Sequence, residues 1–501
     1  MRVTGLAQLI SSNPRPILAP TTGMWLVGQK KDCRTERVKD LSIEDLAQVV
    51  GAFVVSQADS ARARTPRITG ISTDSRTTNA GDCFFAIAGE RFDGHDHVAD
   101  AFARGAACAV VSRDVQAAGP VLKVEDTIVA LGDLAREYRR AGGYKVVAIT
   151  GSVGKTTTRQ IVHHVLSGHF KTHQAQKNFN NTIGLPLTLL DAEPDDEVIV
   201  AELGANQLGE IAYLTRIAQP NVAVVTNVHP AHLAGFGDIE AIVREKTSIA
   251  QGLADDGVFV VNGDIEILTA ACRRLGRPFR TFGKSSDVDC RAEDVVCHGL
   301  RSRFRIRSTP AELPLPGPGN VDNALAAWVA CETLGLTIEQ FADRLRTLPG
   351  VAMRAEPLQI GTLTVLNDCY NANPASMKNA LAILAGLRPK AEEDAKRRTV
   401  FICGHMAELG AQSEALHAEL GRDIAHAGVD VLIGVGEAAK TTVAAAREAS
   451  KHDLQAVCFD DTAALCDNLG RLVGKCDIIL VKGSRAARLE SVVRELMKDY
   501  G

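Results

Sequence analysis

About a third of the way along, the chain reads Lys145-Val-Val-Ala-Ile-Thr-Gly-Ser-Val-Gly-Lys-Thr-Thr-Thr158. Val146–Thr150 has the apolar, β-branched composition of a buried strand, and apolar residues recur at helical spacing after Lys155. A glycine turn between a strand and a helix lets backbone N–H groups close around phosphate oxygens without obstruction by a Cβ atom. The stretch therefore predicts a phosphate-binding loop in an α/β sheet.

Different residues of this loop are expected to contact different parts of the bound phosphate and its metal ion. Lys155 supplies a point charge to the terminal phosphates, and the Thr156 hydroxyl has the position that reaches Mg²⁺. The loop has the short form Gly-x-x-Gly-Lys-Thr, because Ile149 stands where the longer form has its first glycine. A nucleoside triphosphate is the expected ligand, bound by Gly151, Ser152, Val153, Gly154, Lys155, Thr156 and Thr157.

A carboxylate for the metal ion is expected at the end of a neighbouring strand. Glu202 ends the strand-like run Val198–Leu203, where an open α/β sheet places its ligands. Mg²⁺ prefers a few hard oxygen ligands, so Glu202 and Thr156 would suffice together with phosphate and water. The alternative for Glu202 is a structural ion pair. His229 and His232 follow the next strand, and a hydrogen-bonded loop position is the alternative to a ligand role for each.

Composition and charge exclude several classes of protein. The 501 residues are 46% hydrophobic and 23% charged, the balance of a globular chain with several domains. A net charge of −4 does not fit a general nucleic-acid coat or a polybasic membrane binder. Apolar runs such as Val258–Val261 are far shorter than the roughly 20 residues of a membrane span. The 12 cysteines form no C-x-x-C pair, which favours free thiols in a reducing compartment.

Alternating helix and strand patterns predict an α/β fold of three domains. We expect a small α/β N-terminal domain, a central P-loop ATPase domain with a parallel sheet, and a Rossmann-like C-terminal domain. The predicted boundaries are 1–40 for a flexible extension, 41–126, 127–348 and 349–501. Pro314–Gly319 and Leu348–Val351 are the candidate seams before the last domain.

Ordered motifs resemble those of the Mur ligases, the ATP-dependent ligases of peptidoglycan precursor synthesis. The matching segments are Ser72–Arg76, Gly81–Ala86, Phe92–His95, Thr150–Thr157, Asn178–Pro186, Ala201–Asn206, Asn227–Gly237, Asp368–Met377, Glu408–Gly410 and Val481–Arg485. Tyr370–Pro374 and Lys482–Arg485 favour the branch that joins D-alanyl-D-alanine to UDP-N-acetylmuramoyl-tripeptide. The resemblance thus implies a ligase that forms an acyl phosphate from ATP and passes the acyl group to an amine.

The resemblance also implies roles for residues around the phosphate loop. Thr156 and Glu202 would hold one Mg²⁺, His232 would help to hold a second, and Asn181 would lie near the γ-phosphate. Lys246 matches a lysine that the family carbamylates with CO₂, which would make it a metal-binding anion. Ser248 departs from the family pattern here, which often has glutamate at that position.

Further residues are implied in nucleotide and substrate binding. On the nucleotide they are Asn320, Asn323, Arg354, Asp368 and Asn371. In the UDP-binding first domain they are Thr73, Ser75, Asp93 and His95, each of which would also suit a turn or cap. Gly319 replaces a usual histidine, and His405 stands where aspartate is common.

The expected partners are therefore ATP, two Mg²⁺ ions, UDP-N-acetylmuramoyl-tripeptide and D-alanyl-D-alanine. We expect a cytoplasmic monomer without nucleic-acid or membrane partners. Three alternatives stay open: a Mur ligase that adds a single amino acid, a folylpolyglutamate synthase, and a P-loop regulatory protein that binds nucleotide without forming a bond.

Overall fold

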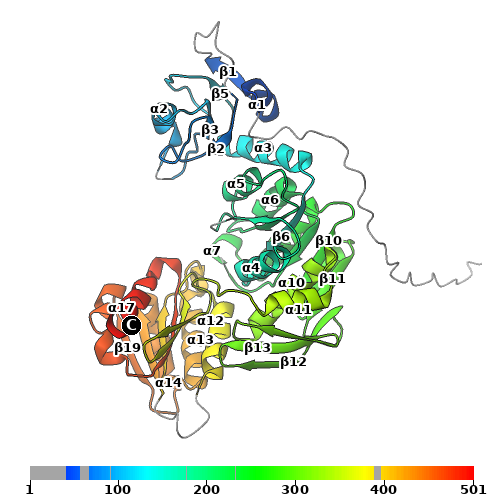
Figure 1. Cartoon of the computed structure of the whole chain (residues 1–501). Coiled ribbons are helices and arrows are strands. Elements are labelled where there is room, and N and C mark those ends of the chain that lie inside the picture. The colour runs from blue at the N-terminus through cyan, green and yellow to red at the C-terminus, as the bar shows by residue number, and fades with distance from the viewer. Residues whose placement is uncertain (1–40, 57–66, 91, 176–177, 232, 389–396) are drawn as a thin grey trace, which may run out of the picture. The chain divides into compact units, whose positions relative to one another are not determined.

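The computed structural model describes residues 41–56, 67–90, 92–175, 178–231, 233–388 and 397–501. Three β-sheets follow one another along this part of the chain (Figure 1). The α/β fold class with N-terminal, central and C-terminal domains is therefore confirmed. The extension expected at 1–40 lies outside the described residues.

The N-terminal domain has a five-stranded sheet in the order β1-β5-β4-β3-β2. Its strands are parallel except β1, which pairs antiparallel with β5. Helix α1 begins after Ser42, whose hydroxyl caps it by accepting a hydrogen bond from the Asp45 N–H at 3.0 Å. The elements are α1 (Ile43–Val50), β1 (Phe53–Ser56), β2 (Gly70–Ser72), β3 (Asp82–Phe85), η2 (Gly94–His97), α2 (Val98–Ala103), β4 (Cys108–Val111) and β5 (Val121–Lys123).

The long helix α3 (Thr127–Ala141) joins the first two sheets in sequence. Asp126 caps it by accepting hydrogen bonds from the backbone N–H groups of Ile128 and Val129. The helix packs against α1 of the first domain and against α5 and α6 of the central domain. It therefore contributes to the hydrophobic core on both sides.

The central sheet has nine strands in the order β14-β13-β12-β11-β10-β9-β6-β8-β7. The strands are β6 (Lys145–Thr150), β7 (Thr172–Gln174), β8 (Val198–Glu202), β9 (Val222–Val225), β10 (Val258–Asn262), β11 (Phe279–Gly283), β12 (Cys290–His298), β13 (Arg301–Ile306) and β14 (Thr309–Leu313). The helices are α4 (Lys155–Leu166), α5 (Gly184–Leu190), α6 (Glu210–Ala218), α7 (Leu233–Phe236), α8 (Ile239–Thr247), η3 (Ser248–Gly252), α9 (Glu266–Arg274), α10 (Pro318–Thr333) and α11 (Ile338–Leu345).

Both faces of the strands around β6 are buried, as a parallel sheet requires. Val146 and Ala148 belong to one hydrophobic cluster with residues of α3, α5 and α6. Val147 and Ile149 belong to another, with residues of α4 and α10. The phosphate loop thus leaves a strand that is fixed on both sides.

The central sheet is not wholly parallel, because β12, β13 and β14 pair antiparallel at its end. Along β13 the side chains alternate between exposed arginines and buried Ser302, Phe304 and Ile306. That alternation is typical of a sheet with one face in water, and the prediction of a parallel sheet did not include these antiparallel strands. Pro314–Gly319 runs from the end of β14 into the first residues of α10, which packs against strands of the central sheet.

The C-terminal sheet has the order β15-β16-β20-β17-β18-β19 and is parallel except at β15. Because β16, β20 and β17 are parallel neighbours, the loops after their carboxyl ends meet at one edge. The strands are β15 (Glu356–Ile360), β16 (Leu363–Asp368), β17 (Thr399–Gly404), β18 (Val431–Val435), β19 (Gln455–Phe459) and β20 (Ile478–Lys482). The helices are α12 (Pro374–Gly386), η5 (Gly410–Gln412), α13 (Ser413–His426), α14 (Glu437–Ala449), α15 (Thr462–Cys466), α16 (Leu469–Leu472), η6 (Arg485–Ala487) and α17 (Glu490–Tyr500).

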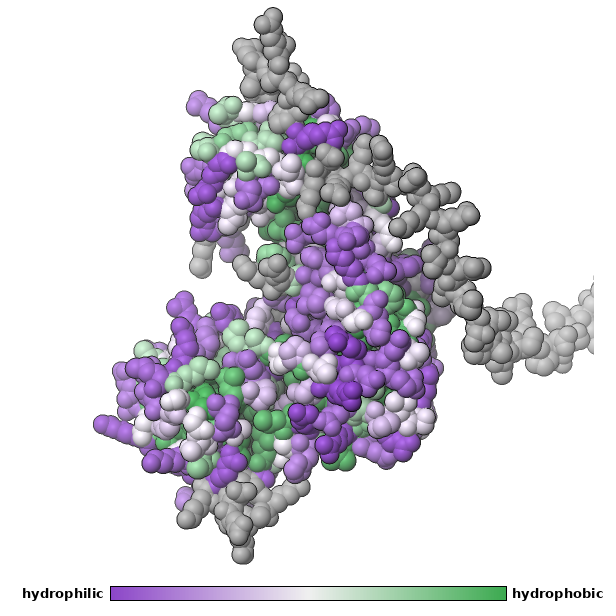
Figure 2. Space-filling model, in the orientation of Figure 1, coloured by the Kyte–Doolittle hydropathy of each residue, from purple (hydrophilic) through white to green (hydrophobic). Residues whose placement is uncertain are grey.

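The described surface shows hydrophilic and hydrophobic residues interspersed on the face drawn in Figure 2. Among the described residues, no helix has both the length and the apolar character needed to cross a bilayer. The eleven cysteines that the structure describes are all free thiols.

Candidate functional site

The predicted phosphate loop connects β6 to α4, as its sequence indicates. Gly151 and Gly154 have φ angles of 146° and 85°, which favour glycine. A Cβ atom at Gly154 would also overlap Oδ1 of Asn323 on α10. Glycine is therefore needed at 154 both for the backbone conformation and for the close approach of α10.

The loop is held by its neighbours. The Asn227 side-chain oxygen accepts a hydrogen bond from the Val153 N–H at 2.9 Å, and Ser152 Oγ donates to the His229 carbonyl at 2.9 Å. Lys155 Nζ donates to the Gly151 carbonyl at 2.7 Å, across the turn. Burial lowers the pKa of Lys155, while the charge of Glu202 opposes that shift. The backbone is thus organised around the position where an anion would sit.

Glu202 lies at the carboxyl end of β8 and is 5% exposed. It accepts hydrogen bonds from Thr156 Oγ1 and from Asn180 Nδ2, both at 2.9 Å. Arg159 Nε lies 3.7 Å from its Oε2. The structural ion pair and the proximity to Thr156 that the sequence suggested as alternatives are both present.

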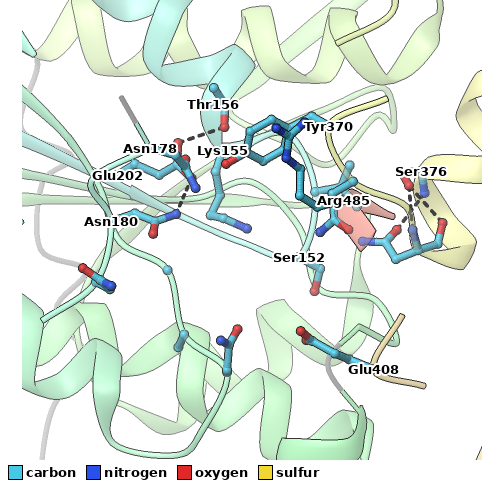
Figure 3. Close-up of a pocket in the computed structure, with 18 of the residues that line it drawn as sticks. Ser152, Lys155, Thr156, Asn178, Asn180, Glu202, Tyr370, Ser376, Glu408 and Arg485 are labelled. Carbon is cyan, nitrogen blue, oxygen red and sulfur yellow. Dashed lines mark hydrogen bonds between the residues drawn. The ribbon is translucent and has the colours of Figure 1, made fainter. Parts of the chain in front are cut away.

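A cavity of about 490 Å³ opens beside the loop (Figure 3). It is lined from the central domain by Ser152–Thr157, Asn178, Asn180–Thr182, Glu202, Gly204–Asn206, Glu210 and Leu214. It is lined from the C-terminal domain by Arg354, Tyr370, Asn371, Asn373, Ser376, Ala407, Glu408 and Ser484–Ala486. Asn181, which the sequence predicts near the γ-phosphate, lies in this wall, and its side-chain oxygen accepts a hydrogen bond from the N–H of Gly184, the first residue of α5, at 2.8 Å.

Arg354 reaches the phosphate loop from the C-terminal domain. Its Nη2 lies 3.4 Å from Thr156 Oγ1, and its guanidinium stacks on the ring of Tyr370 with a centroid distance of 4.1 Å. A positive charge is thus fixed beside the hydroxyl that also contacts Glu202. Tyr370 orients this charge through a cation–π contact.

Lys246 lies on α8 and is 2% exposed. Burial lowers its pKa to about 7, and the positive charge of Lys155 adds to the effect. Its Nζ lies 5.4 Å from the centroid of the Phe236 ring. An amine with this pKa is about half neutral at pH 7, and the neutral form is the one that reacts as a nucleophile.

Asp368 and Asn371 differ in where their side chains lie. Asp368 is buried and accepts a hydrogen bond from Lys482 Nζ at 2.7 Å, which also donates to the Asn371 carbonyl at 3.0 Å. Asp368 is not among the residues that line the cavity, whereas Asn371 is. The ion pair therefore holds the loop that carries Tyr370 and Asn371.

Asn320 and Asn323 are buried at the start of α10 rather than in the cavity wall. Asn320 Nδ2 donates to the Pro316 carbonyl at 2.7 Å. Asn323 Oδ1 accepts from Thr158 Oγ1 at 3.3 Å, while its Nδ2 donates to Asn320. The pair contacts the phosphate-loop helix through Thr158, and its predicted role in nucleotide binding stays a prediction.

The four residues predicted to bind UDP lie in the N-terminal domain, away from the cavity lining. His95 is buried, and its Nε2 accepts a hydrogen bond from the Ser112 N–H at 2.9 Å. Its Nδ1 therefore carries the proton and donates to Asp93 at 2.6 Å. Backbone and side-chain hydrogen bonds lower the pKa of Asp93 to about 2. Thr73 is half-buried and Ser75 is buried; the predicted role of all four in UDP binding stays a prediction.

The predicted metal ligands fall into two groups. Thr156 and Glu202 are in contact, whereas His232 lies outside the described residues. Among the residues that the structure does describe, no three His, Cys, Asp or Glu side chains form a metal-binding group. A Mg²⁺ ion at Thr156 and Glu202 would therefore complete its shell with phosphate and water, as Mg²⁺ commonly does.

Several cavity residues belong to motif segments, but the sequence predicted no individual role for them. They are Asn178, Asn180, Tyr370, Ser376, Glu408, Ser484 and Arg485. The motif segments therefore indicated which parts of the chain line the cavity, but only the fold shows which of their side chains face it. Arg159, which lies beside Glu202, belongs to no motif segment, so its sequence position on α4 did not predict a role in the site.

Family models cover most of the described chain. The Mur ligase family catalytic domain matches residues 67–139, the Mur ligase middle domain 149–331, and the Mur ligase glutamate ligase domain 353–485. The UDP-N-acetylmuramoyl-tripeptide–D-alanyl-D-alanine ligase of Escherichia coli K12 is 36% identical over 439 residues. That alignment covers 86% of this chain and 94% of the relative.

Solved structures agree with these matches. A crystal structure of MurF from Acinetobacter baumannii has a TM-score of 0.82 at 32% identity, covering 92% of this chain and 99% of that one. MurF ligase from Thermotoga maritima in complex with ADP has a TM-score of 0.77 at 28% identity, covering 87% and 98%. The similarity extends through all three domains.

Proposed function

This chain belongs to the Mur ligase family, and from that premise we propose that it joins D-alanyl-D-alanine to UDP-N-acetylmuramoyl-tripeptide at the expense of ATP. The observation that carries the proposal is the cavity in which the phosphate loop faces Arg354, Tyr370 and Arg485 of the C-terminal domain. Relatives that bear this activity in their names align with nearly the full described chain.

The reaction divides into two steps. A carboxylate oxygen of the tripeptide attacks the γ-phosphorus of ATP, and ADP leaves with the electrons of the broken P–O bond. The amine of the dipeptide then attacks the acyl phosphate, loses a proton, and phosphate leaves. Both steps need charge neutralisation, alignment and exclusion of water.

The residues of the cavity suit these needs. Lys155 and the loop N–H groups would hold the phosphates of ATP, with Asn181 and Arg354 near the transferred group. Thr156 and Glu202 fit the first Mg²⁺, since they offer two oxygens already 2.9 Å apart. His232 is proposed for a second ion. Bound Mg²⁺ would supply charge neutralisation on the phosphates.

Lys246 is proposed to carry a carbamate. Its neutral amine would attack CO₂, forming a C–N bond and releasing one proton, and the product is an anion. Its burial and lowered pKa support this reaction, and among the described residues its Nζ has no hydrogen bond or ion pair to a carboxylate. The carbamate would then be a third oxygen donor for metal.

The first domain is proposed to bind the UDP group through Thr73, Ser75, Asp93 and His95. The proposed domain limits are 41–126, 127–348 and 349–501. Adenine contact by Asn320 and Asn323, with Asp368 and Asn371 on the nucleotide side, belongs to the same proposal. A cytoplasmic, monomeric enzyme stays the prediction.

Phosphate release tests the proposal directly. ATP, Mg²⁺ and UDP-N-acetylmuramoyl-tripeptide are incubated with and without D-alanyl-D-alanine. Release should depend on the dipeptide and fall about 1,000-fold in Lys155→Ala. Lys171→Ala, at an exposed lysine paired with Asp195, is the matched control. Release that ignores the dipeptide, or survives Lys155→Ala, contradicts the proposal.

A further inference from the structure

His405 and Ser484 lie side by side because they follow neighbouring parallel strands. β17 and β20 pair with Cys403 opposite Lys482, so the residues just beyond them meet at the cavity edge of the sheet. The Ser484 N–H donates to the His405 carbonyl at 3.0 Å. Ser484 Oγ and His405 Nε2 lie 2.9 Å apart. One backbone and one side-chain hydrogen bond thus hold His405 and Ser484 together.

The two residues relate differently to the cavity. Ser484 is 1% exposed and lines the cavity wall, while His405 lies behind it and is not part of the lining. In the part of the chain that the structure describes, His405 Nε2 is the hydrogen-bond partner of the Ser484 hydroxyl. The direction of that one hydrogen bond decides what Ser484 presents to the cavity.

A second histidine supports the pair from α13. His417 Nε2 accepts a hydrogen bond from the Met406 N–H at 3.0 Å, so this nitrogen carries no proton. Its Nδ1 then donates to the Ser413 carbonyl at 2.7 Å. His417 is therefore neutral and holds the backbone directly after His405.

The charges around His405 are few and mostly paired. Burial lowers its pKa from the ordinary 6.5, and any charge on His417 acts in the same direction. Lys482 at the end of β20 is paired with Asp368. Arg485 of η6 lies 3.2 Å from Glu490 of α17, and Glu408 lies on the same loop as His405. Burial therefore favours the neutral form of His405.

We propose that His405 is a positioning residue whose Nε2 accepts the hydroxyl proton of Ser484, so that the Ser484 oxygen faces the cavity as an acceptor for the amino group of the incoming dipeptide. An amine that directs its lone pair at the acyl carbon has only N–H donors left for contacts with the enzyme, so it needs an acceptor there. This inference rests on the proposed function, because it assigns the amine-binding point within the same cavity.

Protonation of His405 would reverse the arrangement. Nε2–H would then donate to the Ser484 oxygen, and the hydroxyl hydrogen would turn into the cavity, facing the N–H donors of the amine. An ionised aspartate at 405 would also accept the hydroxyl proton. Aspartate, common at this position in the family, should therefore substitute for histidine and remove the dependence on histidine protonation.

The test is the pH dependence of the KM for D-alanyl-D-alanine, from about pH 5 to about pH 8, beside the KM for ATP. In the unmodified enzyme the KM for the dipeptide should rise toward acid, below pH 6.5. His405→Ala and Ser484→Ala should each raise the KM for the dipeptide about 10-fold, and the double variant should raise it no further. The KM for ATP should stay unchanged in all three variants. His405→Asp should keep a low KM and shift the rise to lower pH.

The outcomes separate the two proposals. Dipeptide-independent phosphate release by the unmodified enzyme would overturn the proposed function itself. A dipeptide-dependent enzyme whose KM for the dipeptide is flat with pH, or equal in His405→Ala, would overturn only the role of His405. If His405→Ala does not fold, the pH profile of the unmodified enzyme and the rescue by His405→Asp decide. His426→Asp, at an exposed histidine on α13, should match the unmodified enzyme.

Discussion

The central and C-terminal domains each bury a lysine to the same degree, with opposite consequences. Lys482 is 1% exposed and Lys246 is 2% exposed. Lys482 pairs with Asp368 at 2.7 Å and holds the Tyr370 loop. Lys246 faces the positive charge of Lys155 and an aromatic ring instead. A buried cation with a carboxylate partner is a structural element, whereas one without such a partner is driven toward its neutral, reactive form.

The largest expected difference between the two lysines is catalytic. Lys246→Ala should lower ligation roughly 100-fold or more, because it removes the proposed metal-binding carbamate. A short carboxylic acid added to this variant should restore part of the rate, as measured by phosphate release. Lys482→Ala, assayed with the same acid, serves as the comparison. Rescue of both variants, or of neither, would contradict the distinction.

Next in size is the loss of stability at Lys482. Lys482→Met should destabilise the protein by about 3 kcal/mol, since Asp368 stays buried without its cation. Urea unfolding followed by circular dichroism measures this. The matched control is the double variant Lys482→Met/Asp368→Leu, which should recover most of the loss. A single variant as stable as the unmodified protein would show that the pair is not structural.

Lys246→Met should have the opposite and smaller effect, a gain of about 1 kcal/mol near pH 6. With the folded pKa near 7 and the unfolded value near 10.5, the unfolded chain binds more protons between these pH values. Stability from this group therefore rises with pH through that window. The gain in Lys246→Met should accordingly be largest below pH 7 and shrink toward pH 10, in thermal unfolding without bicarbonate. A gain that grows with pH would contradict the lowered pKa.

The smallest effect concerns the influence of Lys155 on its neighbour. The rate at which an amine-reactive reagent labels Lys246 should rise with pH and reach half its maximum near pH 7. Mass spectrometry of the labelled peptide measures this rate. Lys155→Gln removes a positive charge and should move this half-point upward, by less than about one pH unit. Lys171→Gln should leave it in place. An unchanged half-point in Lys155→Gln would mean that burial alone lowers the pKa.

The sequence predicted local features well where the local pattern and the tertiary structure agree. The loop at Gly151–Thr156 lies between a strand and a helix as predicted, since its pattern depends on residues close together in the chain. The antiparallel extension β12–β14 was missed, because its exposed arginines resemble a polar segment until its buried face is paired. Glu202 was located by its strand end and placed beside Thr156, but its hydrogen bond from Asn180 was not predicted.

The phosphate-binding loop, the α/β class and the family resemblance can be inferred from the sequence, because glycine turns, strand composition and motif order are local features of the chain. Which side chains face the cavity depends on the three-dimensional fold. Asp368 and Tyr370 are two residues apart, yet one is buried against Lys482 and the other stacks on Arg354. His405 and Ser484 are 79 positions apart and lie in hydrogen-bond contact. Such contacts follow from strand order and register, which no local pattern encodes.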